Sequence, residues 1–283
     1  MIDALLGEDA ARRKTALDAC EALADHERFT LANEIAVIAR RTADALAHAD
    51  EHRGPTTAHA AVLGRAALTL SMLRGEVARS TLIRIAEERS YAVKSALARA
   101  LRETKTAEGR SVLVYLLSDD DAQADAIVAI GAAPWPEILP SLIEVAEADD
   151  RAARLAARPI ARCGATAGAA EANAAASFLF EQLDDDAVVI AAADALVRYG
   201  AAFPGVEEQA RRLVKEDNPK RMAGLCLLAA TTAMDAATLR ALAGPKRETD
   251  ERLAHSFLRP LRADGGPKAR EAAERTWRAL KMA

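Results

Sequence analysis

Aromatic residues make up only 4% of this 283-residue chain, and glycine and proline occur just 14 and 10 times. All-β sandwiches and barrels depend on aromatic and β-branched strands joined by glycine- and proline-rich turns, so this composition argues against them. Alanine instead supplies 70 residues. Because alanine is the best helix former and a poor strand former, we predict an all-α protein whose helices pack closely through small side chains.

Cysteine is equally scarce. Cys20, Cys163 and Cys226 are far apart, odd in number and form no CxxC pair. A disulfide framework or a cysteine zinc site is therefore excluded. Each cysteine lies among alanines and leucines in a helical pattern, so we expect three reduced, buried thiols, as in a reducing cytoplasm.

No apolar run reaches the roughly 18 residues that a membrane-spanning helix requires, so we expect no membrane insertion. The first residues lack the basic segment and apolar stretch of a secretory signal peptide. At 51% hydrophobic and 28% charged residues, the chain is also too apolar for intrinsic disorder. We therefore expect a folded, cytoplasmic protein.

The charge is small overall and unevenly distributed. The formal net charge is −4, with 8 basic and 19 acidic residues in 111–217 but 13 basic and 7 acidic residues in 218–283. Basic residues also recur at every fifth position from Arg74 to Arg99, a spacing that does not follow one helix face. Phosphate binding needs a concentrated positive surface, so this balance argues against nucleic acid as the partner.

Helical periodicity runs almost from end to end, and the connections between amphipathic stretches are short. Proline follows a helix-breaking or capping residue at Gly54-Pro55, Asn218-Pro219 and Gly266-Pro267, where new helices are expected to begin. Short connections between helices are typical of antiparallel neighbours. The pattern therefore predicts successive helix pairs.

Three segments of the chain share a common plan. Each has an aspartate cluster, then an alanine-rich helix, then a glycine; the clusters are 119–121, 149–150 and 184–186, and the glycines are Gly131, Gly164 and Gly200. Aspartates in a turn cap the following helix, where the helix dipole favours negative charge. We expect each glycine to adopt a left-handed conformation just past the end of that helix.

The segment 136–164 resembles a HEAT repeat of the bacterial, phycobilisome-lyase-like kind. Its matching positions are Pro140 before a leucine-rich helix, Asp149 or Asp150 in the turn, and Arg154, Ala157 and Ile160 in the second helix. The resemblance implies a right-handed α-solenoid of stacked antiparallel helix pairs. It further implies an N-terminal helical cap at 1–75, repeats over 76–265 and a C-terminal capping helix at 266–283.

Two positions concern the geometry of that array. In the family, turn aspartates and helix arginines of successive repeats form a ladder of hydrogen bonds, and only Arg154 matches the arginine position here. Pro159 lies inside a predicted helix, where it removes one backbone hydrogen bond, so we expect a kink there.

The clearest candidate binding residues lie in and before the helix predicted over 151–163. Arg151, Arg154, Arg158 and Arg162 occupy one narrow face of it, and Trp135 lies in the turn before the repeat. An arginine stripe can bind phosphate, carboxylate or an acidic protein surface, although a solvated helix face gives the same pattern. An exposed tryptophan would anchor a partner, whereas a covered one packs on its neighbouring helix.

No motif identifies a reaction. The chain has no HExxH, phosphate-binding loop, nucleophile elbow or catalytic cysteine signature, so we predict no catalytic residues and no cofactor. His48 and His52 are four residues apart and could share a metal, but the sequence fixes no third ligand. We therefore expect surface histidines and no metal site.

The predicted function is that of a non-catalytic scaffold or adaptor that binds a protein partner, because a helical solenoid offers an extended surface for protein. Two alternatives stay open. Some HEAT-like proteins resemble DNA glycosylases that hold nucleic acid on a basic face, and the repeat type also resembles subunits of bilin lyases, which implies a small-molecule enzyme.

Overall fold

The computed structural model describes residues 1–52, 54, 56–102, 104–133, 135–216, 219–232, 234–245, 247 and 249–281. These residues form helices and turns, with no strand among them, which confirms the all-α prediction. The chain divides into two compact units, unit 1 (Met1–Ala133) and unit 2 (Pro134–Ala283). The boundary lies inside the region predicted to hold the repeats.

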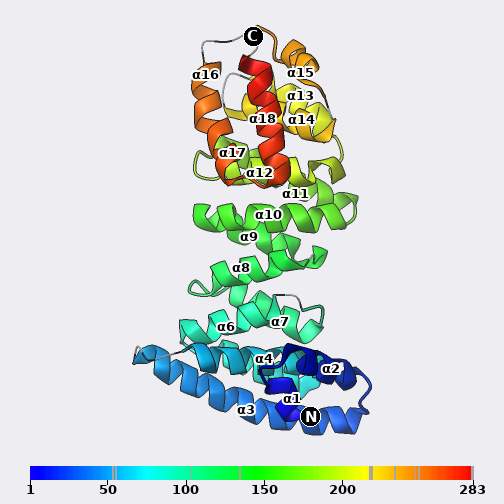
Figure 1. Ribbon diagram of the computed structural model, residues 1–283, viewed down its shortest axis with the longest axis vertical. Helices are drawn as coiled ribbons and strands as arrows, with labels where there is room; N and C mark the ends of the chain where they lie inside the picture. The colour runs from blue at the N-terminus through cyan, green and yellow to red at the C-terminus, as the bar shows by residue number, and fades with distance from the viewer. Residues whose placement is uncertain are drawn as a thin grey trace. The chain divides into compact units, whose positions relative to one another are not determined.

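Unit 1 is built from two layers of helices. The first layer holds α3, α5 and α7, which contact one another in that order; the second holds α4, α6 and α8 (Figure 1). The short helices α1 and α2 pack on α4. The bounds are α1 Ile2–Leu6, α2 Ala10–Glu21, α3 Asp25–Glu51, α4 Thr57–Leu73, α5 Gly75–Ala86, α6 Tyr91–Leu101, α7 Ala107–Leu117 and α8 Gln123–Ala132.

Unit 2 repeats this layering. Its second layer holds α10, α12 and α14, which contact one another in that order. Helices α9, α11 and α13 of the first layer pack beside them. The last helix, α18, lies against both α12 and α14 and so covers part of the second layer. The bounds are α9 Leu139–Ala148, α10 Asp150–Thr166, α11 Ala169–Glu181, α12 Val189–Tyr199, α13 Val206–Leu213, α14 Pro219–Thr231, α15 Ala236–Ala243, α16 Asp250–Leu253, α17 Arg259–Asp264 and α18 Pro267–Lys281, with short 3-10 turns at Pro136–Ile138, Gln182–Asp184 and Gly200–Ala202 and a π-helical turn at Ala254–Leu258.

Alanine and leucine fill the cores of both units, as the composition predicts. Small side chains let neighbouring helices approach closely, and burial of the larger apolar side chains contributes about 25 cal/mol per Å² removed from water. Two of the predicted proline starts are confirmed, since α14 begins at Pro219 and α18 at Pro267. Pro55 and Asn218 lie outside the described residues.

Of the three acidic turns, the one before α10 caps its helix as predicted, with Asp149 as the N-cap residue. The Asp149 carboxylate accepts a hydrogen bond from the Ala152 N–H at 2.8 Å, and Asp185 accepts one from the Ala187 N–H at 2.7 Å. Asp119 accepts one from the Ala122 N–H at 3.1 Å. The Asp149 bond satisfies a backbone donor that α10 leaves open at its start, whereas Asp119 and Asp185 bond to residues that precede α8 and α12.

The prediction for the repeat glycines is wrong. Gly131 and Gly164 lie inside α8 and α10, and Gly200 has a right-handed φ of −57°. Gly164 is required by packing instead, because a Cβ atom there would lie 2.4 Å from the Ala175 Cβ of α11. The positive φ values among described glycines occur elsewhere, at Gly75, Gly205 and Gly244.

Helix α10 continues through Pro159 to Thr166, so the proline does not end the helix. The ion pairs that join helices involve residues other than the expected Arg154, whose guanidinium group forms none with the described residues. Lys94 near the start of α6 pairs with Asp119 in the turn before α8, and the fully buried Arg221 of α14 pairs with Asp250 at 2.9 Å. Asp119 lies in the turn between α7 and α8, and Asp250 is the first residue of α16.

No helix in the described ranges combines the length and the apolar character that crossing a bilayer would demand.

Candidate functional site

The predicted arginine stripe forms the outer face of α10. Arg151, Arg154 and Arg158 are exposed and Arg162 is half-buried, while the opposite face of the helix carries buried alanines. Within the described part of the chain, Arg151 and Arg154 form no hydrogen bond or ion pair through their guanidinium groups. The stripe therefore divides into two free arginines at the start of α10 and two engaged ones further along.

Arg158 is engaged by a buried carboxylate. Its Nη2 lies 2.9 Å from the Asp194 Oδ2 of α12, and Asp194 also accepts hydrogen bonds from Arg198 Nε at 3.1 Å and from the Gly266 N–H at 3.0 Å. Burial raises the pKa of Asp194, but the bonds from Gly266, Arg158 and Arg198 outweigh it and hold the pKa below its usual value. Arg158 thus helps to join α10 and α12 to the start of α18.

Trp135 is half-buried, immediately before the 3-10 turn Pro136–Ile138. Its backbone N–H donates toward the sulfur of the buried Cys163 in α10. The residue is therefore tied to α10 through its backbone, and only part of its side chain is accessible to a partner.

Unit 1 has an open groove on its second layer that the sequence analysis missed. It has a volume of about 700 Å³ and lies between α4 and α6, with α2 at its edge. Small residues on both helices leave the space open, among them Gly64 of α4 and Ala96 of α6. The recurrence of small residues at helical spacing, at Ala60, Gly64, Ala92, Ala96 and Ala100, is the sequence signal that could have indicated it.

Three arginines line this groove. Arg13 donates to the backbone oxygen of Gly7 at 2.9 Å, whereas Arg65 and Arg99 have no side-chain partner in the described ranges. One carboxylate, Asp50, is also present, and it accepts hydrogen bonds from the Ser90 hydroxyl and the Ala92 N–H. The groove is therefore positively charged overall, in a protein with a net charge of −4.

Two buried polar atoms in the groove have no partner. They are the Ser95 Oγ, on a residue only 5% exposed, and the Nε of Arg65. Buried polar groups are nearly always hydrogen-bonded, since leaving one unsatisfied costs about 1–3 kcal/mol. Unpartnered donors beside a groove are candidate contacts for a bound hydrogen-bond acceptor.

Apolar side chains accompany the groove. Tyr91 lines it and is 51% exposed, and its hydroxyl donates to Asp125 of α8 at 3.1 Å. Val128, also on α8, is 61% exposed. Tyrosine and arginine, which both line the groove, are residue types enriched at the energetically important positions of protein interfaces.

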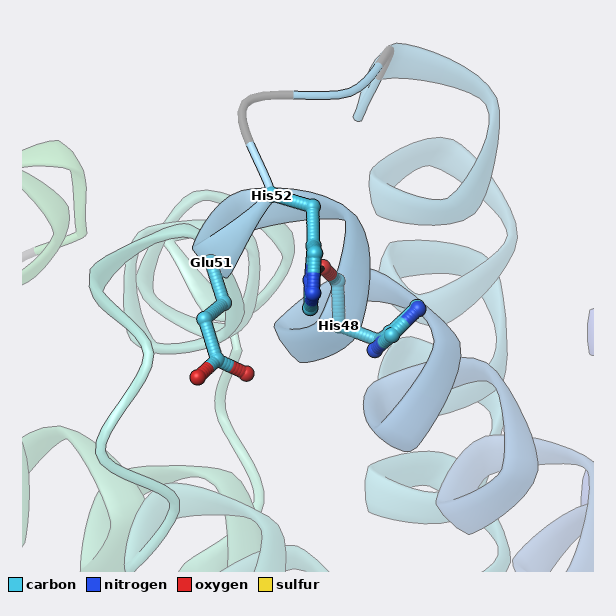
Figure 2. Close-up of side chains that lie close together, drawn as sticks. All are labelled: His48, Glu51 and His52. Carbon is cyan, nitrogen blue, oxygen red and sulfur yellow. Dashed lines mark hydrogen bonds between the residues drawn. The ribbon is translucent and has the colours of Figure 1, made fainter.

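The histidine pair predicted from sequence lies at the end of α3, where the structure adds Glu51. Ligand atoms of His48, Glu51 and His52 all lie within 4.8 Å of one another (Figure 2). The two imidazole rings have centroids 4.1 Å apart, and all three residues are exposed. Among the described residues this is the one group with the composition of a metal-binding cluster.

All three cysteines are buried free thiols, as predicted. Burial raises the pKa of Cys20 and Cys163, and it raises the pKa of Cys226 to about 12. Because the thiolate is the nucleophile, none of these sulfurs is prepared for nucleophilic attack.

Comparison with known proteins found no match to this chain among protein-family models, curated proteins or solved structures.

Proposed function

We propose that this protein is a HEAT-like helical scaffold or adaptor that binds an acidic segment of a protein partner through its second-layer helices. One observation carries the proposal: within unit 1, Arg65 and Arg99 line the groove without a side-chain partner in the described ranges, and within unit 2 the same holds for Arg151 and Arg154 on α10. Free guanidinium groups bind carboxylates through two parallel hydrogen bonds.

Of these two separate candidate sites, the groove on unit 1 is the better formed. It combines two free arginines, an unpartnered Ser95 hydroxyl and the exposed ring of Tyr91. Aspartate or glutamate side chains of a partner supply acceptors for the arginines and the hydroxyl, while the tyrosine ring supplies apolar contact area. The arginines of α10 provide a second contact region on unit 2.

A non-catalytic role agrees with the chemistry of the described residues. Their thiols are buried, and the groove contains no histidine or cysteine that could act as a base or nucleophile. Its single carboxylate, Asp50, is already hydrogen-bonded to the start of α6. The groove can therefore bind and orient a ligand, but its residues supply no acid–base pair.

The proposal is tested by affinity capture from native lysate, with and without nuclease, followed by mass spectrometry. We expect a stoichiometric protein partner that survives nuclease and is lost as salt screens the arginines. In the variant Arg151→Glu/Arg154→Glu, which leaves the Asp194 network intact, capture should fall. Recovery only of nucleic acid, or capture unaffected by salt and by this variant, would overturn the proposal.

A further inference from the structure

We propose that His48, Glu51 and His52 form a binding site for a divalent transition-metal ion, with Zn²⁺ as the best-suited ion. Two imidazoles and one carboxylate are a ligand set that zinc accepts, with one coordination position left for water or for a partner's side chain. The inference is independent of the proposed function, since these residues do not line the groove.

The helix places the three side chains together. His48 and His52 are one turn apart and Glu51 lies between them, so all three project from the same side of the last turn of α3. In Figure 2 the His52 ring lies between the Glu51 carboxylate and the His48 ring. Their ligand atoms, within 4.8 Å of one another, need only side-chain rotations to surround one ion, and exposed side chains can make such rotations.

One hydrogen bond prepares His52 as a ligand. Its Nδ1 lies 2.9 Å from the backbone oxygen of His48, which can only accept, so in this contact Nδ1 carries the proton. The lone pair of a neutral ring is then on Nε2, where a metal can bind it. Metal-binding histidines in proteins are typically oriented in this way, by a bond from the second ring nitrogen to a carbonyl or carboxylate.

The remaining ligands are available. The imidazole ring of His48 and the carboxylate of Glu51 make no hydrogen bond or ion pair with the described residues. The neighbouring Asp50 is already occupied, because it accepts bonds from Ser90 and Ala92 of the next helix pair. The carbonyl end of α3 also carries a partial negative charge, which favours a cation.

The test is calorimetric titration of the tag-free protein with ZnCl₂ in a buffer that does not chelate metals. We expect one saturable site per chain. The variants His48→Gln, His52→Gln and Glu51→Gln should each weaken binding by about tenfold or more, a cost comparable to the loss of supporting groups at other metal sites. The matched control is His26→Gln, which removes another exposed histidine of α3 and should bind as the original protein does.

Circular dichroism checks that each variant keeps its helical content, which exposed substitutions should preserve. The proposal is overturned if no saturable site is found, or if His26→Gln weakens binding as much as His48→Gln. It is also overturned if Glu51→Gln leaves the affinity unchanged, because the site would then lack its carboxylate ligand. The buried cysteines do not compete for the ion in the folded protein.

Discussion

At the scale of single residues, Asp194 joins three segments of unit 2 that are distant in sequence. It accepts hydrogen bonds from Arg158 of α10, Arg198 of α12 and the backbone of Gly266, 72 residues away. The aspartate lies in an alanine-rich helix and looks, in sequence, like one more surface charge. Its role depends on tertiary contacts and could not be predicted from local pattern.

Replacing Asp194 with asparagine should lower the free energy of unfolding by about 1–3 kcal/mol, because Arg158 and Arg198 lose their charged hydrogen-bond partner. The effect should also depend on pH. The pKa of Asp194 is below its usual value of 3.8 in the folded protein, so its contribution is full above that value and is lost as pH falls through the folded pKa. Urea unfolding at several pH values measures both.

The exposed Asp186→Asn is the control for this prediction and should have little effect at any pH. Between about pH 5 and pH 2, the original protein should lose more stability than Asp194→Asn does, since the variant has no carboxylate to protonate. Equal losses in the two proteins would show that Asp194 makes no such contribution.

Ser95 presents the opposite case, a buried group whose value lies in binding. Its hydroxyl has no partner in the groove, so Ser95→Ala should leave the free energy of unfolding unchanged or raise it by up to about 1 kcal/mol. Affinity for the acidic partner should fall, because the partner loses a donor. A loss of stability in chemical unfolding, with unchanged partner affinity, would contradict the role given to Ser95.

At the scale of helices, the sequence predicted the positions of helices better than it predicted the contacts between them. Proline starts predicted α14 from Pro219 and α18 from Pro267, and the turn aspartates predicted the cap formed by Asp149. The glycine ending each segment was misinterpreted, because a glycine needed for close packing and one needed for a left-handed turn look alike in sequence.

Gly164 gives that distinction a direct test. Gly164→Ala should destabilise unit 2 by about 1–3 kcal/mol, because the new Cβ would lie 2.4 Å from the Ala175 Cβ and force α10 and α11 apart. Ala175→Gly in the same chain removes the facing methyl group, and we expect it to restore part of the loss. Thermal unfolding measures both, and a stabilising Gly164→Ala would show that packing does not require the glycine.

The candidate surfaces were only partly predictable for the same reason. The sequence identified the stripe on α10, but not that Arg158 is engaged while Arg151 and Arg154 are free. It did not identify Arg65 and Arg99. These residues belong to different helices and line the same groove only because α4 and α6 are neighbours. Glu51 lies beside His52 in sequence, but only the structure shows that its carboxylate is close to both histidine rings at the end of α3.

At the scale of the whole chain, the same layering recurs in both compact units. In each unit, terminal helices cover part of the second layer: α1 and α2 pack on α4 in unit 1, and α18 packs on α12 and α14 in unit 2. In the scaffold that we propose, the helix pairs provide stability and the exposed helix faces are used for binding.

The central claim is that the second-layer groove binds an acidic protein partner. It is tested most directly by comparing nuclease-resistant partner capture between two charge-reversal variants of unit 1. Arg65→Glu/Arg99→Glu changes the groove, and Arg79→Glu/Arg84→Glu makes the same charge change on exposed positions of α5 in the first layer. The account predicts that the first variant loses the partner and the second retains it. Equal capture by both variants would contradict it.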